Sequence, residues 1–126
     1  MKIDYISTED APKAIGPYSQ GIRANGFVYT SGQIPLDPAT GDLVGGPFED
    51  QVHRVFRNLQ AILTAAGSDF SRVIKATVYV TDLGNFATLN SIYASYFGDH
   101  KPARTTVEVP ALPKDATVEI DLIALA

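Results

Sequence analysis

The segment at residues 49–66 constrains the fold of this chain more than any other part of its sequence. Its apolar residues recur at helical spacing on one side only, and Gly67 stands where a helix can end in the left-handed conformation. A helix with one apolar side must bury that side against another layer of structure. The apolar residues of this expected helix are Val52, Val55, Phe56, Leu59, Ile62, Leu63 and Ala66.

A short hairpin is expected before this helix. Asn25-Gly26 is the dipeptide that a type I′ turn favours, because both of its positions need positive φ. The flanking residues 19–23 and 27–31 should therefore pair as two short strands, after a short apolar start at residues 3–6. Loops rich in proline and glycine are expected at residues 11–17 and 32–48.

Three further strands and a second helix are expected after the first helix. Residues 73–81 alternate between apolar and polar side chains, as a half-buried strand does. A helix with one apolar side is expected at residues 85–97, followed by strands at residues 104–109 and 117–125. The side chains expected beneath the helices are Ile74, Ala76, Val78, Val80, Thr105, Val107, Val109, Val118, Ile120 and Leu122.

The opposite face of this sheet should carry the site. Because side chains alternate strictly along a strand, Arg104 and Glu119 are both expected to face away from the helices. A sheet face that is half apolar is seldom left to bulk water, so it is expected to pack against neighbouring subunits around a closed ring. The sequence thus predicts a single α+β domain over residues 1–126, with two helices on one face of one sheet. The side chains expected on the open face are Tyr29, Tyr79, Arg104, Thr106, Glu108, Glu119, Asp121 and Ile123.

The composition limits the kind of partner that this chain can have. The absence of cysteine excludes a disulfide framework, a thiolate nucleophile and cysteine-ligated zinc, and it fits a reducing cytosol. A net charge of −4 and a pI near 4.9 are a poor electrostatic match for nucleic acid. Neither a signal peptide nor a membrane-spanning apolar run is evident, and neither His53 nor His100 has a partner at metal-ligand spacing. A small molecule is the expected partner, and the cytoplasm the expected location.

Three separated motifs resemble those of one protein family. They are AIGPYSQG at residues 14–21, TSGQIP at residues 30–35 and PARTTVEV at residues 102–109, and LPK at residues 112–114 before Val118 completes the pattern. Their order and intervals, along nearly the whole chain, are similar to those of the RidA/YjgF proteins, the reactive intermediate deaminases.

The resemblance implies a fold and an activity. The fold is chorismate-mutase-like, with one mixed sheet of about six strands and two helices packed on one face. The resemblance also implies a homotrimer with pockets at the subunit interfaces and without a metal or an organic cofactor. Family members hydrolyse reactive 2-enamines and 2-imines, such as 2-aminoacrylate, to 2-keto acids and ammonia. The expected enzyme is thus a 2-iminobutanoate/2-iminopropanoate deaminase that protects pyridoxal-phosphate enzymes.

Two residues are expected to carry the chemistry. The guanidinium of Arg104 presents paired donors that match a carboxylate in bidentate geometry, so it should hold the substrate carboxylate. Glu119 lies in an otherwise apolar strand, where ionised carboxylates are uncommon unless paired or functional, and it could activate the attacking water. The alternatives are a surface salt bridge for Arg104, and for Glu119 an ion pair with Arg104 that holds the trimer together.

Five other residues are expected to bind substrate. Tyr18 could wall the pocket and orient substrate through its hydroxyl, or pack in the core. Ser31 and Gly32 end a strand where the backbone can approach a ligand closely, or form an ordinary strand-to-loop turn. Asn90 matches a family position on the second helix, although helix surfaces carry many asparagines without a function. Thr106 replaces the cysteine of many relatives, so thiol chemistry cannot operate here.

Two other functions remain open at this point. A trimer that binds 2-keto acids or related carboxylates as a sensor would keep Arg104 but would not need catalysis by Glu119. Ribonuclease activity has been proposed for some relatives, but the acidic pI and the lack of a basic aromatic stripe argue against it.

Overall fold

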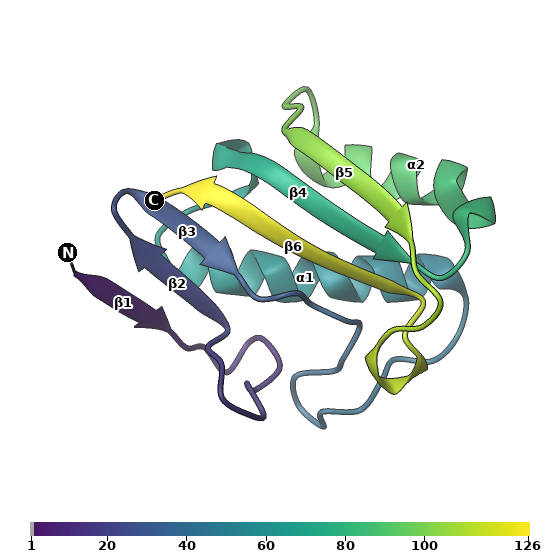
Figure 1. Cartoon of the computed structure of the whole chain (residues 1–126), viewed down its shortest axis with the longest axis horizontal. Helices are drawn as coiled ribbons and strands as arrows, with labels where there is room; N and C mark the ends of the chain where they lie inside the picture. The colour runs from purple at the N-terminus through teal and green to yellow at the C-terminus, as the bar shows by residue number, and fades with distance from the viewer. Residues whose placement is uncertain (1) are drawn as a thin grey trace.

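A computed structural model describes residues 2–126, and its centre is one six-stranded mixed sheet (Figure 1). The strand order across the sheet is β1-β2-β3-β6-β4-β5. Only β4 and β5 pair in parallel, and the other neighbours are antiparallel. The strands are β1 (Ile3–Ile6), β2 (Gly21–Ala24), β3 (Phe27–Thr30), β4 (Val73–Val80), β5 (Ala103–Glu108) and β6 (Val118–Leu125).

Two helices, α1 (Phe48–Ala65) and α2 (Phe86–Phe97), cover the same face of this sheet (Figure 1). The apolar side of α1 is fully buried against β3, β4 and β6. Phe56 joins the two helices, because its ring stacks on that of Tyr96 with centroids 4.5 Å apart. The expected two-layer α+β fold is confirmed, and both helices begin and end within one residue of the expected positions.

The turn chemistry expected from the sequence is also confirmed. Asn25 and Gly26 adopt φ of 52° and 82° between β2 and β3, as a type I′ hairpin requires. Gly67 adopts φ of 79° just after α1, where the amide of Ser68 donates to the carbonyl of Leu63. These two points fix the hairpin register and the end of the long helix.

The expected orientation of Ile74 was wrong. The pairing of β4 with β6 shifts register between Val73 and Lys75, so Val73 is buried and Ile74 is 40% exposed. A bulge of this kind places one extra residue in one strand and so reverses the alternation on one side of it. From Ala76 onward, the alternation in β4 is as expected.

The expected orientation of β5 was also wrong, and this error matters for the site. β5 pairs with β4 so that Arg104 lies beside Ala76 and Thr106 beside Val78, both of which are buried under the helices. Arg104, Thr106 and Glu108 therefore lie on the helix-covered side, while Thr105 and Val107 lie on the open face. β5 lies at the edge of the sheet, where its helix-side residues are still partly exposed to solvent beside α2. The polarity of its side chains therefore did not identify the side that faces the helices.

The open face of the sheet has an apolar half and a polar half. β6 places Glu119 and Asp121 on this face, opposite Tyr79 and Thr77 of β4. The apolar half extends over β1, β2, β3 and the end of β6, where the pairing registers align Ile3, Tyr5, Ile22, Phe27, Tyr29, Ile123 and Leu125. Among residues 2–126, no helix combines the length and the apolarity that crossing a bilayer would require.

Candidate functional site

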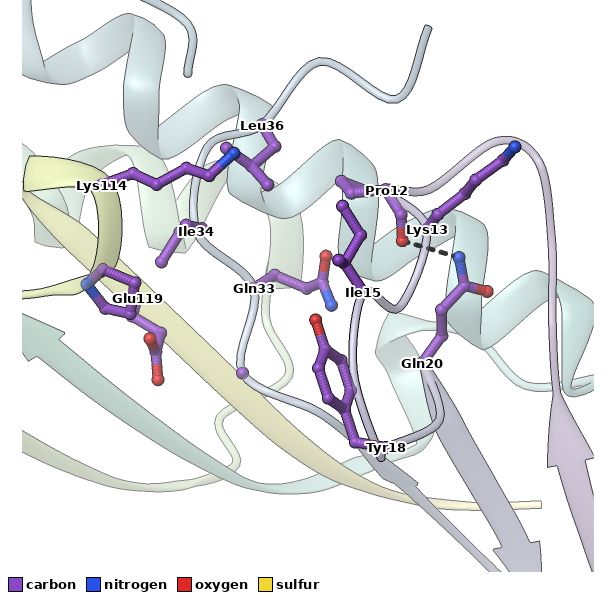
Figure 2. A pocket seen from close by; sticks show the side chains of 12 residues that line it. Pro12, Lys13, Ile15, Tyr18, Gln20, Gln33, Ile34, Leu36, Lys114 and Glu119 are labelled. Atoms are coloured by element: carbon purple, nitrogen blue, oxygen red, sulfur yellow. Dashed lines mark hydrogen bonds between the residues drawn. The ribbon is translucent and has the colours of Figure 1, made fainter. Parts of the chain in front are cut away.

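A cavity of about 370 Å³ opens beside the end of the sheet (Figure 2). The loop before β2 contributes Tyr18, the segment after β3 contributes Gly32, and the start of β6 contributes Glu119. Three of the expected site residues, far apart in the sequence, therefore line one cavity. A segment around Pro113 and Lys114 closes the side next to Glu119.

Gly32 and Glu119 pack so closely that a side chain at position 32 would meet the carboxylate. A Cβ atom added to Gly32 would lie 2.5 Å from Oε2 of Glu119 and 2.9 Å from its carboxyl carbon. The backbone of Gly32 therefore borders one side of the carboxylate. Within the chain the group that approaches Gly32 closely is Glu119, and the expected approach of a ligand stays a prediction.

The pKa of the Glu119 carboxyl is raised above the ordinary glutamate value. Burial raises it first, and the negative charge of Asp121 raises it further. Burial also raises the pKa of Asp121, although the hydroxyls of Tyr79 and Thr77 and the charge of Lys75 oppose this effect. The pKa of Tyr79 is raised in turn, first by the charge of Asp121. A raised pKa makes the Glu119 carboxylate a stronger base than an ordinary glutamate.

The loop that carries Tyr18 is held by a buried glutamine. The side chain of Gln20 accepts from the amide of Thr8 at 2.7 Å and donates to the carbonyl of Pro12 at 2.8 Å. Tyr18 itself is 55% exposed, so the core-packing alternative for it was wrong. Ser31 donates through its hydroxyl to the carbonyl of Ser19 at 2.5 Å, which ties β3 to this loop.

Arg104 lies in a second cluster, against α2. Its guanidinium stands over the ring of Tyr93 at 4.8 Å and over that of Phe86 at 5.5 Å. Within residues 2–126, no carboxylate forms a salt bridge with it. The surface salt bridge is therefore absent from the described chain, and aromatic faces hold the guanidinium instead, which leaves its hydrogen-bond donors free for a ligand.

Polar groups without partners lie around this arginine. Phe86, Asn90 and Tyr93 share one face of α2, because they are four and three residues apart. Oδ1 of Asn90, the hydroxyl of Tyr93 and Oγ1 of Thr106 are buried and have no hydrogen-bond partner in residues 2–126. Unpaired buried polar atoms are costly, so a cluster of them beside a free guanidinium indicates a ligand site.

The structure thus divides the expected site residues into two groups. Tyr18, Gly32 and Glu119 line the cavity, while Arg104 and Thr106 lie on the other face of the sheet, with β4 between β5 and β6. The prediction that Arg104 and Glu119 share a face was wrong, so an ion pair between them cannot form within one chain. One chain alone does not bring Arg104 and Glu119 together.

Phe86 and Tyr93 were missed as site residues. Both lie in the helix expected at residues 85–97, on whose apolar side aromatic residues usually form core. Their spacing with Asn90 could have indicated a site, since an asparagine between two aromatic residues on one helix face interrupts an otherwise apolar stripe.

Replacement of Gly32 by alanine is expected to displace the Glu119 carboxylate toward solvent. The new Cβ would occupy the space that the carboxylate now fills, and the loss of burial would lower the Glu119 pKa toward the ordinary glutamate value. An NMR titration of the side-chain carboxyl carbons measures this change. Gly45→Ala is the matched control, because nothing lies within 4 Å of its added Cβ. Equal Glu119 pKa values in wild type and Gly32→Ala would contradict the packing argument.

Comparisons with known proteins agree with this geometry. The family model described as Endoribonuclease L-PSP matches residues 8–126. A RutC family protein of Pyrococcus horikoshii is 54% identical over 121 residues, which cover 96% of each chain. The chloroplastic Reactive Intermediate Deaminase A of Arabidopsis thaliana is 48% identical over 124 residues, which cover 98% of this chain and 66% of that protein.

Solved structures agree as closely. YyfA of Yersinia pestis, described as a member of the conserved Rid protein family, superposes with a TM-score of 0.97 at 48% identity and covers 99% of this chain and 100% of its own. TdcF of Escherichia coli, solved with bound serine, gives a TM-score of 0.92 at 44% identity over 98% of each chain. By its sequence and its fold, the chain belongs to the RidA/YjgF family.

Proposed function

We propose that this protein is a hydrolytic deaminase of 2-enamine and 2-imine acids, of the 2-iminobutanoate/2-iminopropanoate type. The observation that carries the proposal is the Arg104 guanidinium, held over two aromatic rings and free of any carboxylate in the described chain. The paired N–H donors of a guanidinium suit a small carboxylate ligand. The name of the Arabidopsis thaliana relative, Reactive Intermediate Deaminase A, supports the same activity.

The proposed reaction uses Arg104 and Glu119 in different roles. Arg104 holds the substrate carboxylate, and an enamine first gains a proton at its terminal carbon and loses one from nitrogen to give the imine. Glu119 takes a proton from water, whose oxygen bonds to the imine carbon while the C=N π electrons move to nitrogen. Return of that proton to nitrogen gives a carbinolamine. Glu119 then passes the hydroxyl proton of the carbinolamine to the same nitrogen as the C–N bond breaks, which releases ammonia and leaves a 2-keto acid. No metal ion or organic cofactor takes part in this scheme.

The proposed site needs two copies of the chain. Arg104 with Asn90 and Thr106 would come from the α2–β5 edge of one subunit, and Tyr18, Gly32 and Glu119 from the cavity of its neighbour. The apolar half of the open face supports such an assembly, because exposed residues such as Tyr5, at 74% exposure, would be covered. We propose a homotrimer with one site at each of three interfaces.

A second candidate function is non-catalytic binding of 2-keto acids or related carboxylates. The structure of TdcF with bound serine supports it, because that relative binds a stable amino acid. The two functions differ in what Glu119 does. A Glu119→Gln variant that still binds a 2-keto acid but no longer speeds imine hydrolysis supports the enzyme.

The experiment that tests the proposal is the rate of pyruvate release from freshly generated 2-iminopropionate. The wild-type protein is expected to accelerate release well above the rate in buffer. A rate equal to that of buffer, with keto-acid binding retained, would overturn the enzyme in favour of the binding protein.

The pH dependence of this rate should follow the Glu119 pKa. The base must be ionised, so kcat/KM rises with pH through the Glu119 pKa, which is raised above the ordinary glutamate value by burial and by Asp121. Lys75 and Tyr79 are the other titratable groups that act on Asp121. Asp121→Asn removes a negative charge, so the Glu119 pKa falls and the acid limb of the profile moves to lower pH. The exposed Asp99→Asn is the control, and an unmoved limb in Asp121→Asn would refute the coupling.

A further inference from the structure

The cavity extends well past Glu119, and apolar side chains line much of this part of it. They are Ile15, Ile34 and Leu36 with Pro12, and Pro113 next to Glu119. About 370 Å³ exceeds the space needed by an imine whose side chain is a single methyl group. This part of the cavity has room for a longer substrate side chain.

Gln33, which lines this cavity, differs from the other polar residues that are less than 9% exposed. The structure buries five polar side chains to below 9% exposure in residues 2–126, and four of them hydrogen-bond to the protein. Gln33 is 7% exposed, and its carboxamide has no hydrogen-bond partner among these residues. The four with partners are Gln20, Gln51, Asn58 and Ser68.

The backbone of Gln33 is held by the strand that carries Glu119. The amide of Gln33 donates to the carbonyl of Ile120 at 2.9 Å, and the amide of Ile120 donates back at 3.2 Å. Figure 2 shows the carboxamide of Gln33 and the hydroxyl of Tyr18 pointing toward one another across the cavity. The same figure shows the ammonium of Lys13 pointing away, and Lys114 donates to the carbonyl of Gly41.

The carboxamide atoms of Gln33 are not among the buried unpaired polar atoms of residues 2–126, so they face the cavity, where water can reach them. With no hydrogen bond inside the described chain, their donor and acceptor are available to a ligand. A ligand group that both donates and accepts, as a carboxamide does, matches Gln33 and the Tyr18 hydroxyl together.

We infer that Gln33 is a specificity-determining residue, whose carboxamide selects 2-imino acids with a neutral polar side chain over aliphatic ones of the same size. The inference rests on the proposed function, because that function places the reacting carbon beside Glu119 and directs the substrate side chain into the cavity. A site that hydrogen-bonds a substrate group discriminates strongly against an analogue that lacks the group.

Two substrates of equal size test this inference. The 2-imino acids derived from asparagine and from leucine have nearly the same shape, and an amino-acid oxidase that accepts both amino acids can generate them in situ. Wild-type kcat/KM is expected to favour the asparagine-derived imine. In Gln33→Met the ratio of the two kcat/KM values should fall by roughly 10-fold or more, mainly by loss on the polar substrate.

A matched variant separates specificity from structure. Gln33→Met loses no hydrogen bond within the described chain, so its Tm should lie within about 2 °C of wild type. Gln51→Met makes the same chemical change at a buried glutamine that accepts from the amide and the hydroxyl of Thr117, at 3.1 and 2.5 Å. That variant should lower Tm and leave the substrate ratio unchanged.

The outcomes distinguish this inference from the proposed function. Hydrolysis of both imines with the same ratio in wild type and Gln33→Met would overturn the role of Gln33 alone. Hydrolysis of neither imine would overturn the proposed deaminase activity. Calorimetry would then measure whether Gln33 favours the polar one of the two corresponding 2-keto acids. A binding ratio that Gln33→Met leaves unchanged would overturn the inference in that case as well.

Discussion

Replacement of Arg104 by alanine is expected to abolish measurable acceleration of 2-iminopropionate hydrolysis. The guanidinium can give a substrate carboxylate two charge-assisted hydrogen bonds, each worth about 1.5–3 kcal/mol, so their loss lowers kcat/KM by roughly 100-fold or more. No carboxylate within residues 2–126 pairs with Arg104, so its removal leaves no buried charge unpaired. The measurement is pyruvate release by wild type and variant under identical conditions.

Two further variants make this result specific. Arg104→Lys keeps the charge but loses the planar fork and its stacking over Phe86 and Tyr93, so it should recover little activity. Arg72→Ala removes an exposed arginine that pairs with Asp69, and should leave kcat/KM unchanged. Unfolding free energy should change by only about 1 kcal/mol in Arg104→Ala, the size of a cation–π contact. Full activity in Arg104→Ala would remove the carboxylate anchor from the mechanism.

Mixing two inactive variants is expected to restore activity. Arg104→Ala keeps an intact cavity with Glu119, and Glu119→Gln keeps an intact α2–β5 edge with Arg104. If each site takes one half from each of two subunits, random reassortment during co-refolding restores about a quarter of the wild-type sites. Because these two residues lie on opposite faces of one sheet, one chain cannot supply both to one site, and the recovery therefore tests the proposed sharing between subunits.

The control mixes Arg104→Ala with the double variant Arg104→Ala/Glu119→Gln, which cannot form a wild-type site in any combination. Native mass spectrometry of the mixtures shows whether the chains have exchanged and gives their number in the assembly. A recovery no greater than that of the control, in mixtures that have exchanged, would refute a site shared between subunits. A monomeric mass for the wild type would refute it more directly.

The sequence determined the elements and their layers, because these depend on local chemistry and on periodicity. The spacing of the apolar residues in α1, the Asn25-Gly26 turn and Gly67 after the helix each have one low-energy solution. Two helices with one apolar side each can bury those sides on one face of one sheet. The three motifs also identified the family before any geometry was known.

The sequence did not determine which side of β5 meets the helices. Both sides of an edge strand are partly exposed. Burying the side of β5 that carries Arg, Thr and Glu therefore costs nearly the same free energy as burying the side that carries Thr and Val. The bulge that turned Ile74 outward was hidden for a similar reason, because one extra residue in a strand leaves no mark on its composition.

Most of the candidate site was identified as residue types, but its arrangement was not. Alternation along a strand says which residues share a side, while the pairing of β5 with β4 decides which side that is. Only the tertiary structure therefore placed Arg104 over Phe86 and Tyr93, put Glu119 against Gly32 on the other face, and left the carboxamide of Gln33 unpaired in the cavity. These contacts join segments far apart in the chain, and their energies depend on neighbours that no local pattern contains.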